Sequence, residues 1–134
     1  MQTLQIESRE ALAQVLEVEL AELERLALSP AARRGEYYKH FTIPKRSGAP
    51  RRISAPVASL KHVQRGLLDD VFSAHALHDN AHGFRDGRSI VSNARAHVGS
   101  EVLVNIDLED FFPSITRPRV LGLVRALGYS DDVA

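Results

Sequence analysis

Three acidic residues lie close together in the sequence, beside apolar and aromatic residues. Asp107, Glu109 and Asp110 fall within four positions, between the apolar run 102–106 and a pair of phenylalanines. Carboxylates beside aromatic side chains are costly to bury unless a cation compensates their charge. Magnesium prefers carboxylate oxygens and commonly bridges them to substrate phosphates. The string therefore indicates a divalent-metal site that could serve phosphoryl chemistry.

Spacing alone leaves a second interpretation open. Asp107 could simply cap the turn after a strand, with the other two acids solvated. If strand geometry continues for two residues, Asp107 and Glu109 share one face and Asp110 takes the other. Periodicity does not decide which acid binds a metal.

Basic side chains gather in one part of a chain whose formal net charge is zero. Residues 31–66 carry nine basic side chains and one acidic one. A local basic patch attracts polyanions whatever the total charge, because physiological salt screens fields beyond ~8 Å. Four of these basic residues flank a Ser47-Gly48 turn: Lys45, Arg46, Arg51 and Arg52. Such a basic hairpin either binds phosphates specifically or is a solvated or generic backbone-contacting surface.

A glycine-bearing loop over 82–90 carries two further arginines, Arg85 and Arg88. They either touch phosphates or hold the loop through its own salt bridges. The histidines His75, His78 and His82 have spacings that can place imidazoles on one helix face, as in zinc sites. No fourth ligand accompanies them and a glycine follows the last, so we expect them to be positional, hydrogen-bonding residues.

The elements that must position these residues follow from hydropathy and capping signals. Apolar residues at helical spacing follow a Ser8 cap, and Ser29-Pro30 ends that run. We expect one or two helices over 9–28, a half-buried strand over 36–43, a turn over 45–50, a return strand over 51–54, an amphipathic helix over 57–74, a short helix after Ser89, a buried strand over 102–106 and a helix over 117–127. The buried strand would deliver Asp107 to its carboxyl end.

Composition excludes several classes. The chain is 44% hydrophobic and 25% charged, as in ordinary globular domains. It has no cysteine, so disulfides and cysteine-ligated metals are impossible. It also lacks a signal-peptide pattern and any apolar run of the ~20 residues that span a bilayer. We therefore expect a soluble, cytoplasmic protein.

Three strings resemble motifs of reverse transcriptases, in the family's order. Residues 105–115, NIDLEDFFPSI, resemble the first palm motif in the form found in retron and related bacterial enzymes. Residues 43–56 resemble the first fingers motif, and 82–90, HGFRDGRSI, resemble the second. The helical pattern LKHVQRGLL over 60–68 also fits, so the resemblance covers about 36–127.

The resemblance implies roles for particular residues. Asp107 would be the catalytic metal ligand, assisted by the backbone carbonyl of Leu108, with Mg²⁺ as cofactor and Mn²⁺ as an alternative. Phe112 would sense the sugar 2′-hydroxyl. Lys45 and Arg51 would be the main triphosphate contacts, Arg46 and Arg52 the lesser ones, and Arg85 would touch phosphates beside template and nucleotide.

The resemblance also implies an architecture and partners. We expect an α+β fold forming the fingers and early palm of a right-hand polymerase, with an incomplete palm and no thumb. Its parts would be an N-terminal helical segment (1–30), fingers (31–100) and the start of the palm (101–134). The function implied is RNA-directed DNA synthesis by two-metal nucleotidyl transfer. Partners would be a structured RNA template and primer, deoxynucleoside triphosphates, the DNA product and, for a retron, an effector protein in antiviral defence.

Two features depart from the family. The aromatic-x-Asp-Asp motif that supplies the remaining metal-binding carboxylates is absent, and the sequence stops at 130–134, a stretch resembling the start of another helix. We therefore expect a fragment or one half of a split polymerase, inactive alone. The alternative is a non-catalytic RNA-binding or assembly module derived from the same fold. Group II intron and diversity-generating enzymes remain relatives to be separated by thumb and RNA sequences.

Overall fold

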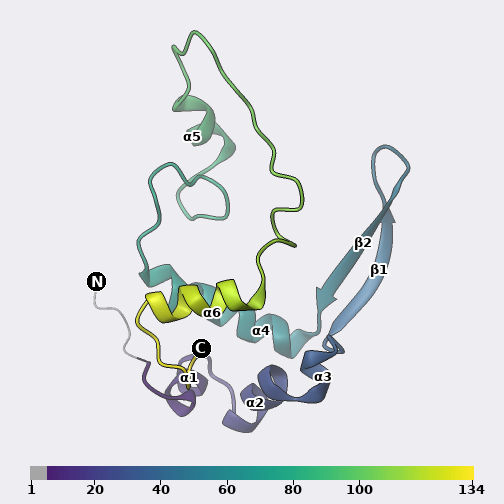
Figure 1. Ribbon diagram of the computed structural model, residues 1–134, viewed down its shortest axis with the longest axis vertical. Coiled ribbons are helices and arrows are strands. Elements are labelled where there is room, and N and C mark those ends of the chain that lie inside the picture. The colour runs from purple at the N-terminus through teal and green to yellow at the C-terminus, as the bar shows by residue number, and fades with distance from the viewer. Residues whose placement is uncertain (1–5) are drawn as a thin grey trace. The chain divides into compact units, whose positions relative to one another are not determined.

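The computed structural model is an α+β chain and describes residues 6–134 (Figure 1). Of the expected N-terminal segment 1–30, only 6–30 is therefore described. The chain divides into two compact units, one that runs to His75 and resumes at Leu123–Ala134, and one formed by Ala76–Gly122. Each is considered by itself. Across 6–134, no helix has the length and apolar character needed to cross a membrane.

Two helices open the first unit, as predicted for 9–28. Helix α1 (Arg9–Val15) begins after Ser8, whose hydroxyl accepts a hydrogen bond from the backbone N–H of Ala11 at 3.2 Å. The chain then turns at Glu17, which has a φ of 54°. Helix α2 (Leu20–Leu28) follows. The left-handed residue Glu17 lies in the break between the two helices, and the leucine spacing alone did not locate this break.

The Ser29-Pro30 stop is confirmed, because α2 ends at Leu28. Proline lacks the amide needed to continue a helix but suits the first position of a new one. A single turn, α3 (Pro30–Arg33), begins there. The Ser29 hydroxyl accepts a hydrogen bond from the N–H of Ala32 at 3.1 Å. The proline thus separates two helical segments instead of opening a loop.

The first half of the amphipathic helix expected over 57–74 is helix α4 (Ala58–Gly66). It continues into a π-helical turn, η1 (Leu67–Val71), and then a 3₁₀ turn, η2 (Phe72–Ala74). It packs closely on the end of α1: a Cβ added at Gly66 would lie 2.8 Å from Cδ2 of Leu16. The core of the unit joins α1, α2, α4 and the C-terminal segment, through Ile6, Leu12, Ala13, Leu16, Leu23, Leu26, Val63, Val71 and Tyr129.

The predicted basic hairpin is confirmed. Strand β1 (Tyr38–Pro44) pairs antiparallel with β2 (Pro50–Pro56). In Figure 1 this two-stranded ribbon extends away from α2 and α3 of its own unit. The expectation that one face of the strand is buried is wrong, since Phe41 on that face is 50% exposed and Ile43 is 40% exposed. Among the described residues the sheet has only these two strands, and most of their residues are exposed.

The second unit contains the short helix α5 (Ile90–Arg95). Its predicted cap at Ser89 is confirmed, because Ser89 and Ser92 form a reciprocal capping box. Helix α6 (Arg117–Ala126) follows the acidic string, close to the predicted 117–127. Gly128, with a φ of 95°, follows its end.

The buried strand predicted over 102–106 is wrong. This stretch forms no strand, and its apolar side chains are 66–78% exposed. β-branched residues favour a strand only where a neighbouring strand can pair with the backbone and another surface can cover the side chains. Within residues 6–134 the one strand pair is the hairpin. The propensity is present, but no described strand pairs with this run.

Candidate nucleotide-binding and metal site

An open hollow of about 540 Å³ lies around the acidic string in the second unit. Two of the three acids, Asp107 and Asp110, line it, and Glu109 does not. The remaining lining residues are Ile106, Leu108, Phe111, Phe112 and Pro113. The hollow therefore combines two carboxylates with an aromatic wall.

The backbone explains why Asp110, rather than Glu109, joins Asp107. Residues 109–114 form turns, and Asp110 has a φ of 49°. Aspartate tolerates this left-handed conformation better than most residues. The turn is closed by the N–H of Ser114, which donates to the carbonyl of Asp110 at 3.0 Å. Residues 102–108 form no strand, so the condition under which Asp107 and Glu109 would share one face is not met.

The donor set of the hollow suits an ion that takes part of its ligands from substrate. No ion pair within residues 6–134 involves any of the three acids. The same residues contain no group of three His, Cys, Asp or Glu side chains able to hold a metal. Magnesium is usually held by one or two carboxylates with water and phosphate oxygens. The hollow is lined by two carboxylates, Asp107 and Asp110, which is within that number.

Three aromatic rings meet beside the hollow. The rings of Phe111 and Phe112 lie edge to face, with centroids 5.3 Å apart. The ring of Phe84 approaches Phe112 in the same manner at 6.2 Å. Phe84 belongs to the glycine-bearing loop 82–90, so the loop and the acidic string come together. The sequence analysis singled out only the arginines of this loop and missed Phe84, although it directly follows Gly83 in the motif.

The loop is held by its own polar contacts. The guanidinium of Arg85 donates to the carbonyl of His78 at 3.1 Å. Arg88 forms an ion pair with Asp79 at 3.6 Å. Both arginines therefore have structural partners, while their remaining N–H groups leave the predicted phosphate contacts untested. His82 Nδ1 lies 2.9 Å from the Ser92 hydroxyl.

The predicted hydrogen-bonding role of the histidines is confirmed in this loop and at its start. Besides the contact of His82, the backbone N–H of Asn80 donates to His78 Nδ1 at 3.2 Å. In the first unit, His75 Nε2 lies 3.1 Å from the hydroxyl of Tyr129. Each imidazole has a polar partner that fixes its position.

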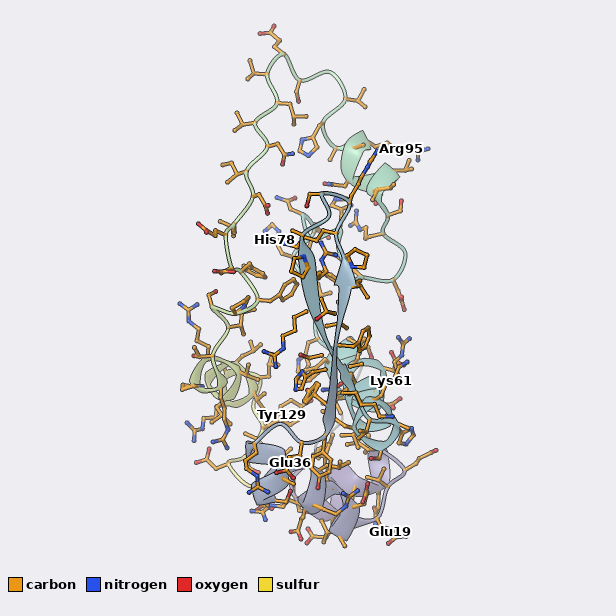
Figure 2. The ribbon with its side chains drawn as sticks, turned by 90° about the vertical axis from the view of Figure 1, so that its right-hand side faces the viewer. Glu19, Glu36, Lys61, His78, Arg95 and Tyr129 are labelled. Carbon is orange, nitrogen blue, oxygen red and sulfur yellow. The ribbon has the colours of Figure 1, made fainter. Side chains whose placement is uncertain are left out.

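The four predicted hairpin cations lie in the first unit, two in the turn and two on β2. The turn is closed by the N–H of Lys45, which donates to the carbonyl of Ala49 at 2.8 Å. Neighbouring Arg51 and Arg52 lie opposite Ile43 and Thr42. Because successive strand residues alternate, these arginines project to opposite faces of the ribbon; Figure 2 draws the chain with its side chains.

The two faces differ in character. Arg51 shares its face with Phe41, Ile43 and Ile53, and Arg52 shares the other with polar residues. On that polar face His40 Nδ1 lies 2.9 Å from the Ser54 hydroxyl. The ion pairs within residues 6–134 include none of Lys45, Arg46, Arg51 and Arg52. All four are therefore available to an anionic ligand.

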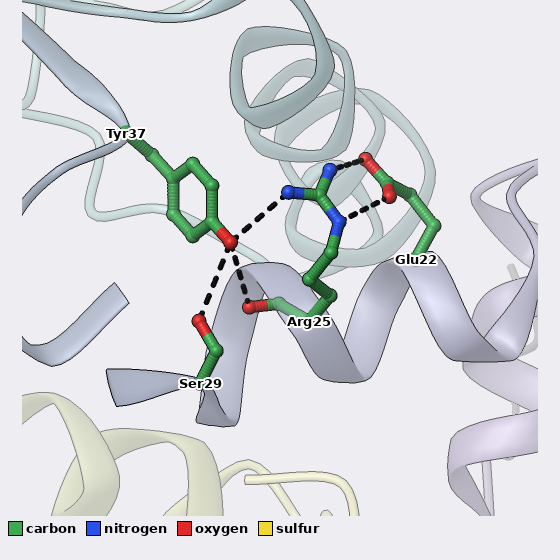
Figure 3. A network of polar contacts seen from close by, with 4 residues as sticks. All are labelled: Glu22, Arg25, Ser29 and Tyr37. Carbon is green, nitrogen blue, oxygen red and sulfur yellow. Dashed lines mark hydrogen bonds and ion pairs between the residues drawn. The ribbon is translucent and has the colours of Figure 1, made fainter. Parts of the chain in front are cut away.

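The base of the hairpin is tied to α2 through Tyr37, the residue before β1 (Figure 3). Its hydroxyl accepts a hydrogen bond from the Arg25 guanidinium at 3.0 Å and lies 3.3 Å from the Ser29 hydroxyl. The guanidinium also sits 5.1 Å from the ring centroid. Glu22 binds the same guanidinium with both oxygens, and this hydrogen bonding raises the pKa of Arg25. The network gives the ribbon a fixed point of attachment.

Comparison with known proteins agrees with this arrangement. The family described as "Reverse transcriptase (RNA-dependent DNA polymerase)" matches residues 43–132, which contain the hairpin, the loop and the acidic string. The chain belongs to this family.

Its relatives include retron enzymes. The retron Mx162 reverse transcriptase of Myxococcus xanthus is 44% identical over 127 residues, which are 95% of this chain and 26% of that protein. The retron Mx65 reverse transcriptase of the same organism is 42% identical, over 95% of this chain and 30% of that protein. The retron Ec86 reverse transcriptase of Escherichia coli is 36% identical, over 69% and 30% respectively. No solved structure matches the chain. The predicted resemblance is confirmed, and the chain spans less than a third of the length of these relatives.

Proposed function

We propose that the chain provides the fingers and the first palm motif of a retron-type RNA-directed DNA polymerase. The observation that carries this proposal is the hollow in which Asp107, Asp110 and Phe112 meet. It places carboxylates beside an aromatic ring, within the residues that match the family. On this view 1–30 is a helical extension, 31–100 the fingers and 101–134 the beginning of the palm.

Asp107 would hold a magnesium ion, with manganese as a substitute, and the carbonyl of Leu108 would assist. When bound, the metal would neutralise phosphate charge and activate the attacking hydroxyl. The two-metal arrangement implied by the resemblance needs further carboxylates besides Asp107. Asp110 lines the same hollow and would add a second negative charge to it.

Phe112 would select the sugar by sterics. A ring packed under the ribose leaves no room for a 2′-hydroxyl and so favours deoxynucleotides. The hairpin would supply the triphosphate contacts, through Lys45 and Arg51 first and Arg46 and Arg52 second, and Arg85 would add another. Guanidinium groups bind phosphate oxygens strongly because two N–H donors act together with the charge.

The partners proposed are a structured RNA as template and primer, deoxynucleoside triphosphates and the DNA product. An effector protein in antiviral defence, or a second polymerase fragment, would complete the assembly. The cytoplasm is the proposed location, and a cysteine-free sequence fits its reducing conditions. The retron relatives support the choice of polymerase type.

The test is Asp107→Asn in the product of the complete gene, with Glu109→Gln as the matched control. Both changes replace one carboxylate by an amide, but only Asp107 lines the hollow. We expect Asp107→Asn to abolish DNA synthesis on an RNA template, with RNA binding unchanged, and Glu109→Gln to retain most synthesis. Synthesis by Asp107→Asn at the wild-type rate would refute the assignment. RNA binding without synthesis in the wild-type protein would favour the non-catalytic module instead.

A further inference from the structure

Phe84 combines two features that need a common explanation. Its backbone has a φ of 55°, a left-handed conformation that bulky side chains rarely adopt and that persists only where surrounding contacts impose it. Its ring is nevertheless 95% exposed, so burial in a core does not account for its placement. Strain of this kind commonly marks residues whose position matters for function.

Polar contacts of neighbouring residues flank Phe84 on both sides in the sequence. Before and after it, His82 is joined to Ser92 at 2.9 Å and Arg85 donates to the carbonyl of His78 at 3.1 Å. These bonds hold the loop closed on itself. Phe84 lies between these two contacts, and its side chain is exposed.

The ring of Phe84 contacts the ring of Phe112. The two rings lie nearly perpendicular, at 82°, with centroids 6.2 Å apart. Phe111 contacts the same ring at 72° and 5.3 Å. Edge-to-face pairs at these separations are attractive. Phe112 thus has one aromatic contact from its chain neighbour and a second from a separate loop.

We propose that Phe84 is a positioning residue for Phe112 and sharpens the selection of deoxynucleotides over ribonucleotides. The inference rests on the proposed role of Phe112 in sensing the sugar. A ring excludes a 2′-hydroxyl only while it stays in place, and the edge-to-face contact with Phe84 would oppose movement of Phe112 toward that side. The strained backbone of Phe84 is explained by this task.

The experiment measures single-nucleotide incorporation by the complete gene product, with a deoxynucleotide and the matching ribonucleotide. The readout is the ratio of the two kcat/KM values, which cancels differences in the active fraction of each preparation. The variants are Phe84→Ala, Phe84→Leu, Phe84→Tyr, Phe112→Ala and the double variant Phe84→Ala/Phe112→Ala. Val98→Ala is the control, because Val98 is an 82% exposed residue of the same unit.

We expect Phe84→Ala and Phe84→Leu to lower the ratio by about 2- to 10-fold, the range that corresponds to the loss of one aromatic pair. Phe84→Tyr keeps the ring and should retain the ratio, as should Val98→Ala. In the Phe112→Ala background, the change at Phe84 should have no further effect. Phe84→Leu preserves bulk and serves if the alanine variant yields too little folded protein.

Two outcomes separate the failure of this inference from that of the proposed function. If Phe112→Ala lowers the ratio and neither Phe84→Ala nor Phe84→Leu does, Phe112 selects the sugar without help from Phe84. If Phe112→Ala leaves the ratio unchanged, its proposed role is wrong and this inference is wrong with it. An equal loss from Phe84→Ala with and without Phe112 would also overturn the positioning role, because the effect would not pass through that ring.

Discussion

Replacing Gly66 by alanine should destabilise the protein, although the same change in a helix normally stabilises it. Gly66 has helical backbone angles, φ −59° and ψ −43°. In an open helical site, alanine is more favourable than glycine by about 1 kcal/mol. At Gly66, however, the new Cβ would lie 2.8 Å from Cδ2 of Leu16, which is 2% exposed and cannot move into solvent.

Overpacking a filled core costs about 1–3 kcal/mol. Subtracting the helix gain leaves a net loss of about 1 kcal/mol of unfolding free energy, or about 3–5 °C in Tm for a chain of this size. Gly122, in α6, is the matched control, since a Cβ there meets no described atom within 4 Å. Gly122→Ala should therefore stabilise by about 1 kcal/mol. The two identical substitutions are expected to have opposite signs.

Urea unfolding followed by circular dichroism at 25 °C measures both changes, provided that the m-value stays constant. A third variant tests the cause. Leu16→Ala costs about 2–5 kcal/mol on its own, but it removes the obstructing atom, so adding Gly66→Ala should then stabilise. The reasoning fails if Gly66→Ala stabilises as much as Gly122→Ala, or if it remains destabilising after Leu16 is truncated.

Two further predictions concern the hairpin. Arg51→Ala should lower kcat/KM for deoxynucleotides in the complete gene product by about 10-fold or more, the cost of one charge-assisted hydrogen bond. Arg52→Ala, on the opposite face, should lower kcat/KM by less. Equal losses in steady-state kinetics would contradict this ranking. At the hairpin base, a hydrogen bond from Arg34 lowers the pKa of Glu36 below its ordinary value of 4.5. Its contribution is therefore fully present above pH 4.5 and is lost as pH falls through the lower, folded-state pKa; urea unfolding should show a shallower acid loss for Glu36→Gln, and identical pH profiles would count against the contact.

Local signals in the sequence were sufficient for elements whose stability is local. The Ser8 cap, the Ser29-Pro30 break, the hairpin with its Gly48 turn and the Ser89 cap all depend on residues within a few positions of one another. The transition of α4 into a π turn at Leu67 was not predicted. The apolar spacing over 57–74 is compatible with either hydrogen-bond pattern, so hydropathy cannot distinguish them.

The candidate site was predicted in part. The motif resemblance selected Asp107, Leu108 and Phe112, and the structure brings all three to one hollow. It did not select Asp110, because the left-handed turn that directs this residue inward replaces the expected alternation. Nor did it select Phe84, whose contact with Phe112 joins two motifs distant in sequence. The missing strand over 102–106 has the same origin: pairing is nonlocal, and β propensity alone cannot supply it.

The opposite placement of Arg51 and Arg52 makes the length of the hairpin turn a chemical variable. The five residues 45–49 fix the register in which Pro44 faces Pro50. A shift of one residue turns every side chain of a strand to the other side. One residue inserted between the strands, with the turn geometry kept, would move Arg52 beside Phe41 and Arg51 beside Thr42. An insertion that changes no arginine would thus exchange the faces on which the two cations lie, and with them the proposed contacts to the triphosphate.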